Sequence, residues 1–305
     1  MPRDASATHS FRAKHAALYA SERDCSRYDV ALCRCQDHEG NLLRALEQHV
    51  GVPLDGRHVV VDVGTGTGKL ARLLAPHVRR VDAFDRSEEM VAAARAATGA
   101  ENVRFAAADV RQVPLPDGCA DLVVVGWAVS YLKAEHEVWH ADGSSSGPWR
   151  EEVDAALQEM DRLLVPGGAA VVLETLGTAC ATPTRSGSHL YAHFRRRGFH
   201  EAAVRTDYRF RSRAEALETL LFFFGKGVAA RATALLADAP PDAPPDAPCT
   251  VPECTLLCWR HKRRTAPAAA AAVGDVRRRR GVRLASALVV VGLVVLAAAR
   301  ARRRH

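Results

Sequence analysis

The chain has 305 residues, of which 48% are hydrophobic and 25% are charged. These values exclude a wholly disordered protein and allow one large domain with a sizeable core. The net charge of +7 is unevenly distributed: residues 260–305 hold 13 Lys and Arg and one acidic residue, whereas residues 1–259 hold 29 Lys and Arg and 34 Asp and Glu. Because phosphate contacts need basic side chains spread over the binding face, this acidic body disfavours nucleic acid as a partner.

The cysteines favour reduced thiols in a cytosol-facing protein. The chain has no Cys-x-x-Cys pair, and it is longer than the small secreted domains that disulfides stabilise. It also shows no apolar signal region near residue 1. We expect no bound metal, and we expect His136 and His140, beside the loop 141–148, to be structural. The eight cysteines are Cys25, Cys33, Cys35, Cys119, Cys180, Cys249, Cys254 and Cys258.

Hydrophobic periodicity predicts helix over residues 11–50, ended by Gly51 and Pro53. Beyond this cap, short apolar runs alternate with helical segments, which is typical of βαβ units and a parallel sheet covered on both faces. The predicted strands are Val59–Val63, Val81–Phe84, Val103–Ala106, Leu122–Val125 and Ala169–Leu173, and the predicted helices between them are Lys69–Leu74, Ser87–Ala97 and Glu151–Leu164.

The second half of the body is predicted to continue this fold. We expect a strand over Val204–Phe210, a helix over Ala214–Phe224 and a closing strand over Val251–Arg260. The repeated Ala-Pro-Pro-Asp of Asp238–Pro248 is a loop, because proline fits neither a helix interior nor a central strand. The run Leu220–Gly225 is expected to belong to the core or to a lid.

The C-terminal stretch Leu284–Ala299 has 16 uncharged residues between clusters of arginine. At 1.5 Å per residue its helix would be ~24 Å long, and snorkelling arginines can supplement that length toward the ~30 Å hydrocarbon core. The sequence predicts a C-terminal transmembrane helix as a single anchor, with a packed or interfacial helix as the alternative. The predicted organisation is a helical cap at 1–57, a catalytic domain at 58–262, a flexible basic linker at 263–283 and the anchor at 284–299.

The strongest local motif is Val59-Val-Val-Asp-Val-Gly-Thr-Gly-Thr-Gly-Lys-Leu70, a buried strand that leads through a glycine turn into a helix. Glycines at 64, 66 and 68 let the backbone turn tightly and approach a ligand. A dinucleotide fingerprint would need glycine where Lys69 stands, and the spacing excludes a P-loop. A purely structural turn remains the alternative.

Acidic residues follow the next two strands. Asp85 comes 21 residues after Gly64, where a carboxylate can accept hydrogen bonds from both hydroxyls of a ribose. Ser87 is placed to cap the following helix, Asp109 follows the third strand, and Trp127 follows the fourth.

With these motifs the sequence resembles the class I S-adenosylmethionine-dependent methyltransferases, in particular the small-molecule type 11 group, over about residues 58–175. The resemblance implies a Rossmann-like, seven-stranded, mostly parallel α/β sheet with helices on both faces, and S-adenosylmethionine as cofactor. It implies that Asp62 and the glycine loop hold the methionine portion, Asp85 the ribose, and Asp109 with Val110 the adenine. The full set of implied cofactor-binding residues is Asp62, Gly64, Thr65, Gly66, Gly68, Asp85, Arg86, Asp109, Val110 and Trp127.

The acceptor side is less defined, because methyl transfer from a sulfonium needs mainly alignment of the acceptor. No acidic pair or nucleophile dyad stands out. Trp127 and Tyr131 are the catalytic candidates, and Tyr19 and Tyr28 are substrate candidates, since tyrosines before the first strand often cover this site in the family. Each is as readily explained by core packing.

We therefore predict a monomeric methyltransferase that acts on a small, lipophilic acceptor near a membrane, with its domain facing the cytosol. Three alternatives remain open at this point. These are a catalytically silent, membrane-tethered binding module of the same fold, a protein methyltransferase, and a nucleotide-dependent oxidoreductase, which Lys69 disfavours.

Overall fold

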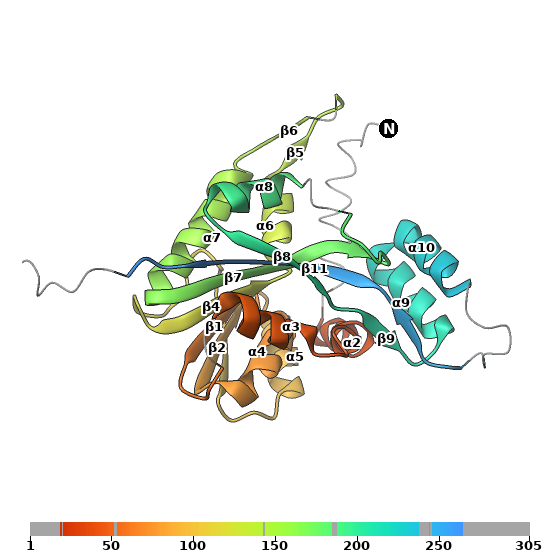
Figure 1. Cartoon of the computed structure of the whole chain (residues 1–305), viewed down its shortest axis with the longest axis horizontal. Helices are drawn as coiled ribbons and strands as arrows, with labels where there is room; N and C mark the ends of the chain where they lie inside the picture. The colour runs from red at the N-terminus through yellow and green to blue at the C-terminus, as the bar shows by residue number, and fades with distance from the viewer. Residues whose placement is uncertain are drawn as a thin grey trace, which may run out of the picture. The chain divides into compact units, whose positions relative to one another are not determined.

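The computed structural model describes residues 19, 21–51, 54–142, 144–184, 188–237, 244 and 246–264 (Figure 1). These fall almost wholly within the first of two units, Met1–Lys262. Within this part of the chain, no helix combines the length and the apolar character that crossing a membrane requires. The predicted anchor at 284–299 lies outside the described residues, as does the predicted linker from 265 onward.

A seven-stranded sheet forms the centre of the unit, in the order β3-β2-β1-β4-β7-β11-β8. All neighbouring strands are parallel except β11, which runs antiparallel to both β7 and β8. The predicted Rossmann-like, mostly parallel sheet is therefore confirmed. The strands are β1 (Val59–Val63), β2 (Arg80–Asp85), β3 (Val103–Ala107), β4 (Ala120–Gly126), β7 (Leu164–Thr178), β8 (His200–Arg205) and β11 (Glu253–His261).

Alternation along the central strands creates two separate cores, because successive side chains point to opposite faces. Val61 of β1 and Val123 of β4 pack into one buried cluster, whereas Val60 and Val124 pack into the other. Both faces of these strands are buried, which explains why they consist of unbroken apolar runs.

Helices cover both faces of the sheet (Figure 1). On one face lie α3 (Asn41–Ala45), η2 (Leu46–Val50), α4 (Lys69–Leu74), η3 (Ala75–His77) and α5 (Glu88–Ala97). On the other lie α6 (Val129–His136), α7 (Trp149–Leu163) and α8 (His189–Arg196). Ser87 caps α5 as predicted, since its hydroxyl accepts a hydrogen bond from the Met90 N–H at 3.1 Å.

The N-terminal helical prediction is interrupted in the structure. Helix α2 (Glu22–Ala31) is followed by the short turn η1 (Cys33–Cys35), and α3 begins only at Asn41. The break contains Asp37 and Gly40, both with a positive φ that a helix cannot include. Residues 11–18 of the predicted helix lie outside the described residues.

A smaller layer adjoins the main sheet. It consists of the two-stranded sheet of β9 (Tyr208–Phe210) and β10 (Cys249–Val251), covered by α9 (Arg213–Phe224) and α10 (Lys226–Ala237). Helix α10 was not predicted. The loop 141–148 contributes to a hairpin of β5 (Val138–Trp139) and β6 (Ser145–Ser146).

Two predicted strands are each split between the two sheets. Val204–Phe210 divides into the end of β8, which pairs with β11 in the main sheet, and all of β9, which pairs with β10 in the smaller sheet. Val251–Arg260 divides at Pro252, which has no N–H to donate to a ladder. The prediction of one continuous strand was wrong in both places, although the antiparallel closing pair β8–β11 is present.

Candidate active site

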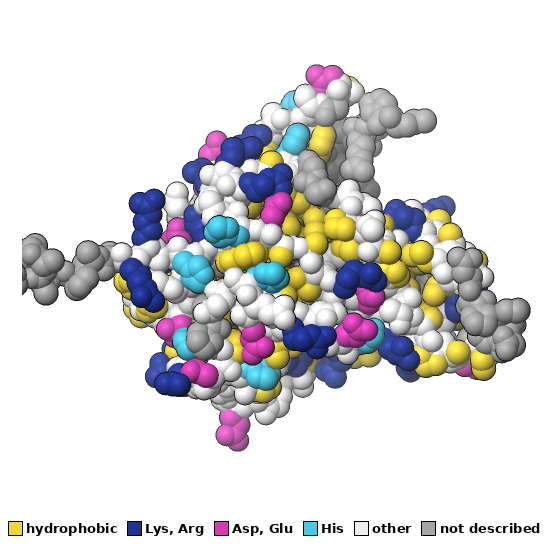
Figure 2. Space-filling view, viewed as in Figure 1, with side chains coloured by type: hydrophobic (Ala, Val, Ile, Leu, Met, Phe, Trp, Pro, Cys, Tyr) yellow, Lys and Arg dark blue, Asp and Glu magenta, His cyan; other side chains and the backbone are white. Residues whose placement is uncertain are grey.

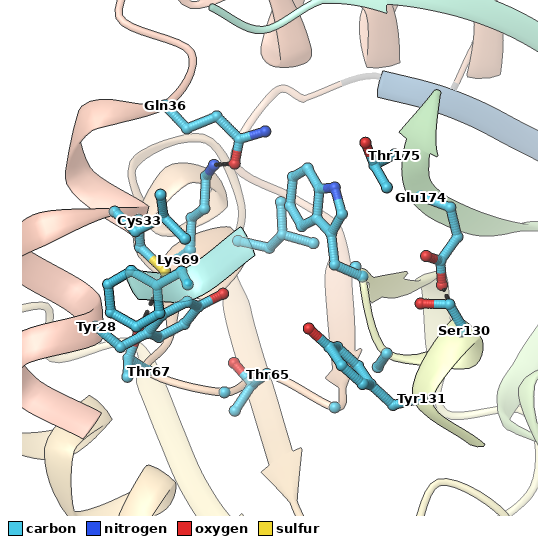
Figure 3. A pocket seen from close by; sticks show the side chains of 18 of the residues that line it. Tyr28, Cys33, Gln36, Thr65, Thr67, Lys69, Ser130, Tyr131, Glu174 and Thr175 are labelled. Carbon is cyan, nitrogen blue, oxygen red and sulfur yellow. Dashed lines mark hydrogen bonds between the residues drawn. The ribbon is translucent and has the colours of Figure 1, made fainter. Parts of the chain in front are cut away.

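A cavity of about 800 Å³ opens at the carboxyl ends of β1 and β4, where the strand order reverses (Figure 3). In open α/β sheets, ligands bind at this crevice between strands that connect in opposite directions. The sheet, the N-terminal segment and the α9–α10 layer all contribute to its wall.

The glycine loop after β1 forms part of the wall with left-handed backbone. Gly64, Gly66 and Gly68 have φ of +70°, +54° and +82°, which side-chain-bearing residues rarely adopt. A Cβ at Gly64 would lie 2.6 Å from the Ala128 Cβ, so the loop packs directly against the end of β4. At Gly66 a Cβ would meet no atom within 4 Å, so a ligand can approach the backbone there.

Asp62 is the penultimate residue of β1, just before this loop, and it places a buried carboxyl group at the cavity. Its Oδ2 accepts a hydrogen bond from the Thr65 hydroxyl at 2.6 Å, and its Oδ1 has no hydrogen-bond partner among the residues that the structure describes. Burial raises the pKa of Asp62 to about 7. Such a group is suited to a cationic ligand, because a positive charge would both satisfy the oxygen and stabilise the ionised form.

Asp85, at the end of β2, faces the same loop. Its Oδ2 accepts a hydrogen bond from the Gly66 N–H at 2.8 Å and its Oδ1 one from the Ser87 N–H at 3.0 Å. Burial raises the pKa of Asp85 above its usual range. Each carboxylate oxygen can accept a second hydrogen bond, so Asp85 can still bind vicinal hydroxyls.

The other two predicted charged contacts are already paired within the chain. Asp109 accepts from the Arg111 side chain with both oxygens, at 2.8 and 2.6 Å, and this partner holds the pKa of Asp109 below its usual range. Arg86 forms an ion pair with Glu135. Asp109, Arg86 and Val110 all line the cavity, and both charged side chains among them are already ion-paired.

The N-terminal segment is fastened to the glycine loop through Asp29 of α2. The buried Asp29 carboxylate accepts hydrogen bonds from the Thr67 hydroxyl at 2.9 Å and from Arg72, and it pairs with Arg34 at 2.7 Å. This contact, which the sequence did not reveal, holds α2 against the first turn of α4.

The three tyrosine candidates all line the cavity. Tyr19 and Tyr28 pack edge to face with ring centroids 5.1 Å apart, and Tyr28 also packs against Phe223 at 5.5 Å. Burial and a hydrogen bond with Tyr131 raise the pKa of Tyr19. The structure therefore brings the predicted aromatic residues together, whereas their role toward an acceptor stays a prediction.

Lys69 is the most distinctive residue that the sequence analysis did not place in the site. It begins α4, and its Nζ donates a hydrogen bond to Gln36 Oε1 at 2.5 Å and lies 4.6 Å from the centroid of the Trp127 ring (Figure 3). Burial lowers the pKa of Lys69 to about 8. Trp127 is held there by a left-handed backbone (φ +53°) whose N–H donates to Leu173 O at 2.7 Å.

Two buried carboxyl groups also line the cavity. Glu174 of β7 accepts a hydrogen bond from the Ser130 N–H at 2.8 Å, and Glu253 of β11 accepts one from the Thr175 hydroxyl at 2.7 Å. Each is 1% exposed. Lys69 was visible in the glycine motif, but no local pattern marks these two acids or Gln36, which come from distant segments of the chain.

The α9–α10 layer contributes three apolar side chains and Arg231 to the wall of the cavity. Phe223, Phe224 and Val228 line it, so the Leu220–Gly225 run does act as a covering segment as well as core. Figure 2 shows hydrophobic side chains gathered over these helices among basic ones. Leu221, Phe222 and Leu235 are exposed there, with the Arg27 guanidinium 4.2 Å from the Phe222 ring centroid.

The cofactor end of the cavity fits S-adenosylmethionine. A buried acid with an open oxygen, Asp62, suits the amino group, and a backbone cradle at Gly66 and the carboxylate of Asp85 suit the remaining polar groups. The sheet order, the position of the cavity and this donor set together define the class of Rossmann-like, S-adenosylmethionine-dependent methyltransferases.

Comparison with known proteins identifies the family. A family model described as a methyltransferase domain, of the type 11 group, matches residues 61–172. Residues 61–172 of this chain therefore match a methyltransferase domain, in agreement with the predicted resemblance, enzyme class and cofactor.

Several characterised methyltransferases are similar to part of the chain. The ubiquinone/menaquinone biosynthesis C-methyltransferase of Rubrivivax gelatinosus is 30% identical over 125 residues, 41% of this chain and 42% of that protein. The malonyl-[acyl-carrier protein] O-methyltransferase of Pectobacterium atrosepticum is 30% identical over 155 residues, 51% of each chain. The demethylmenaquinone methyltransferase of Thermus thermophilus is 36% identical over 120 residues, 38% of this chain and 46% of that protein. The matches thus span about half the length of these relatives.

Proposed function

We propose that this chain transfers the methyl group of S-adenosylmethionine to a small, lipophilic acceptor. The observation that carries the proposal is the division of one cavity into two chemically different ends. Asp62, the glycine loop and Asp85 form one end, and an enclosed space between aromatic side chains, including Tyr28, Tyr208 and Phe223, forms the other. A binding module that had lost its activity would have no need for this second compartment.

The residues of the chain contribute mainly by position. Asp62 and Asp85 hold the cofactor, which supplies an already activated sulfonium methyl group. The aromatic wall excludes water and orients the acceptor, and alignment of this kind accounts for a large share of the rate in a displacement between two bound molecules. Tyr19, Tyr28 and Tyr131, which lie together, cover the space in which the two substrates would meet.

The relatives support a lipophilic acceptor in two cases and an acyl-carrier-bound acceptor in the third, according to their names. The apolar wall at Phe223 and Phe224 favours the former. A protein acceptor is disfavoured, because a peptide needs an open groove with backbone partners rather than a cavity lined by aromatic and buried charged side chains.

The experiment that tests this function is calorimetric titration of the full chain with S-adenosylmethionine, S-adenosylhomocysteine and NADH. We expect micromolar binding of both sulfur compounds and none of NADH. Binding followed by no methyl transfer to any lipid extract would favour the silent module, and NADH binding alone would favour the oxidoreductase.

We also propose that the protein acts as a monomer at the cytosolic face of a membrane, anchored by residues 284–299. The arginine-flanked apolar sequence of that segment and the exposed apolar side chains of α9 and α10 support this placement. Deletion of residues 284–305 is expected to release the protein from vesicles in a flotation assay and to leave cofactor affinity unchanged. Continued flotation of the truncated protein would move the membrane contact to α9–α10 or the N-terminus.

A further inference from the structure

Lys69 is a half-buried cation whose direct partners are uncharged. Its Nζ contacts the amide oxygen of Gln36 and the face of Trp127. Within the described ranges, no carboxylate oxygen lies within 4.0 Å of this nitrogen. A purely structural lysine normally buries its stem and keeps its charge in water or beside an acid, since a buried charge without a counter-ion is costly.

Lys133 provides a comparison, because it is a lysine of the same fold whose charge is paired with an acid. Lys133 of α6 also lies over a tryptophan, with its Nζ 5.0 Å from the centroid of the Trp149 ring, but it is ion-paired with Glu137. Lys133 does not line the cavity, whereas Lys69 does. The charge of Lys69 is thus directed toward the space that a ligand would fill.

The position of Lys69 is fixed from two sides. Gly68, with φ +82°, brings the chain into α4 so that residue 69 lies at the helix start beside the cavity. Gln36 is itself held by a hydrogen bond from its Nε2 to the Thr206 hydroxyl at 3.2 Å. A cation held in this way is preorganised to stabilise negative charge that develops on a bound molecule.

The surroundings select the kind of oxygen that Lys69 would bind. Glu174 and Glu253 line the same cavity, with Glu253 near enough to act on the charge of Lys69, and they disfavour a permanently ionised acceptor such as a carboxylate. A hydroxyl group, by contrast, can donate a hydrogen bond to a carboxyl oxygen and accept one from an ammonium. The nearby walls of Trp127 and Tyr208 are apolar, which suits an uncharged framework around that hydroxyl.

We propose that Lys69 binds the acceptor, through the oxygen of a weakly acidic hydroxyl group, and stabilises the negative charge that this oxygen gains when it loses its proton ahead of methyl transfer. The inference rests on the proposed methyltransferase function and adds the acceptor-binding residue and the acceptor's functional group.

The chemistry balances without a further reactant. The hydroxyl O–H bond breaks and its proton leaves to solvent. The electron pair of the resulting oxyanion, or of a carbon conjugated to it, forms the new bond to the methyl carbon. The C–S bond breaks and its electron pair stays on sulfur, which changes the sulfonium to a neutral thioether.

The test uses full-length protein loaded with S-adenosylhomocysteine and a hydroxyl probe whose ionisation is visible, 4-nitrophenol. Its absorbance is followed against pH when free and when bound. We expect binding to lower the pKa of the probe by about one unit, because an ammonium within hydrogen-bonding distance favours the phenolate. Lys69→Met, which keeps the stem and removes the charge, should abolish the shift, and Lys69→Arg should restore part of it.

Matched controls separate this inference from its alternatives. Lys133→Met removes the paired lysine outside the cavity and should leave the shift unchanged. 4-Nitroanisole, which lacks the hydroxyl, should bind wild type and Lys69→Met equally, whereas decanoate tests for a carboxylate acceptor. If Lys69→Met fails to fold in a thermal melt, Lys69→Gln provides the uncharged variant.

The outcomes distinguish the two proposals. If wild-type protein does not bind S-adenosylhomocysteine, the proposed function itself is contradicted. Intact cofactor binding together with an unshifted phenol, no phenol binding, an equal shift in Lys69→Met, or decanoate binding that depends on Lys69 would each overturn the role of Lys69 alone. Once an acceptor is identified, Lys69→Met is expected to lower kcat about 100-fold with cofactor affinity within about twofold of wild type.

Discussion

At the end of the cavity proposed for the cofactor, the polar groups come from one stretch of the chain, Asp62 to Asp85. The proposed acceptor end combines Lys69 of that same stretch with Gln36 and Glu253 from distant segments. The cofactor end presents buried acids and open backbone, which suits a ligand with a cationic amino group. The acceptor end presents a cation held by an amide and an indole. On the proposed function the two ends suit different ligand groups, because one presents acids and backbone alone and the other presents a cation together with buried acids.

Gly64→Ala should cause the largest effect, because it disturbs the point where the two ends meet. The new Cβ would clash with Ala128 and the backbone would be held at φ +70°, so we expect a loss of stability of about 3 kcal/mol, measured by urea unfolding. Gly56→Ala has a similar φ of +80° but meets no atom within 4 Å, and should lose only about 1 kcal/mol. Equal losses would show that the packing against Ala128 is unimportant.

Asp85→Ala should weaken S-adenosylhomocysteine binding by about 1.5–3 kcal/mol, since it removes charged hydrogen-bond acceptors and releases the Gly66 and Ser87 N–H groups. Asp109→Ala is the matched comparison, because that carboxylate is already paired with Arg111, and its effect should be several-fold smaller. The affinities are measured by calorimetry. An unchanged affinity in Asp85→Ala would remove the cofactor from this end of the cavity.

The raised pKa of Asp62 predicts that both stability and S-adenosylhomocysteine affinity depend on pH. Its pKa is about 7 in the folded protein and 3.8 when unperturbed, so the folded state retains the proton between these values. Burial of the charge therefore lowers stability as pH rises through this window, whereas cofactor binding requires the ionised form. S-Adenosylhomocysteine affinity should rise about tenfold from pH 6 to pH 8.

The variant Asp62→Asn separates these two consequences. It should remove the pH dependence of affinity, and its stability relative to wild type should be greater at pH 8 than at pH 5, measured by thermal unfolding at both values. An affinity profile that keeps its slope in Asp62→Asn would assign the titration to another group.

Thr67→Val should have the smallest effect of the four. It removes the hydrogen bond to Asp29 that joins α2 to the glycine loop, and a loss of about 1 kcal/mol in stability is expected. Because valine keeps the shape that Thr67 presents to the cavity, and Asp29 is not among the described residues that line it, S-adenosylhomocysteine affinity measured by calorimetry should change less than threefold. A larger loss of affinity would show that the N-terminal segment shapes the cofactor end directly.

Much of the fold and the cofactor end was predictable, because both depend on contiguous residues. The run Val59–Val63 is buried on both faces and matches β1 at each end, and the glycine loop follows it without interruption. The split of Val204–Phe210 was not predictable, since it depends on pairing with two different strands from a distant part of the chain, β11 and β10. Helix α10 was missed because its apolar residues are mostly alanines without a clear amphipathic stripe.

The proposed acceptor end could hardly be predicted from the sequence, because its residues come from segments that are not contiguous. Gln36 enters the cavity only because Asp37 and Gly40 turn the chain between helices, and Glu253 enters only through the pairing of β11 with β7. Lys69 is part of the glycine motif, so its presence was visible in the sequence. Its contacts with Gln36 and Trp127 were not, because these residues are distant in the chain.

The contact between Gly64 and Ala128 also sets a limit for protein engineering. The segment that begins with Trp127 and Ala128 is an obvious target for altering acceptor preference, since it forms one wall of the cavity. A side chain larger than methyl at residue 128 would press on the glycine loop and displace the cofactor as well. Libraries that keep Ala128 and vary Trp127 and Tyr131 should therefore retain cofactor binding far more often than libraries that vary the whole segment.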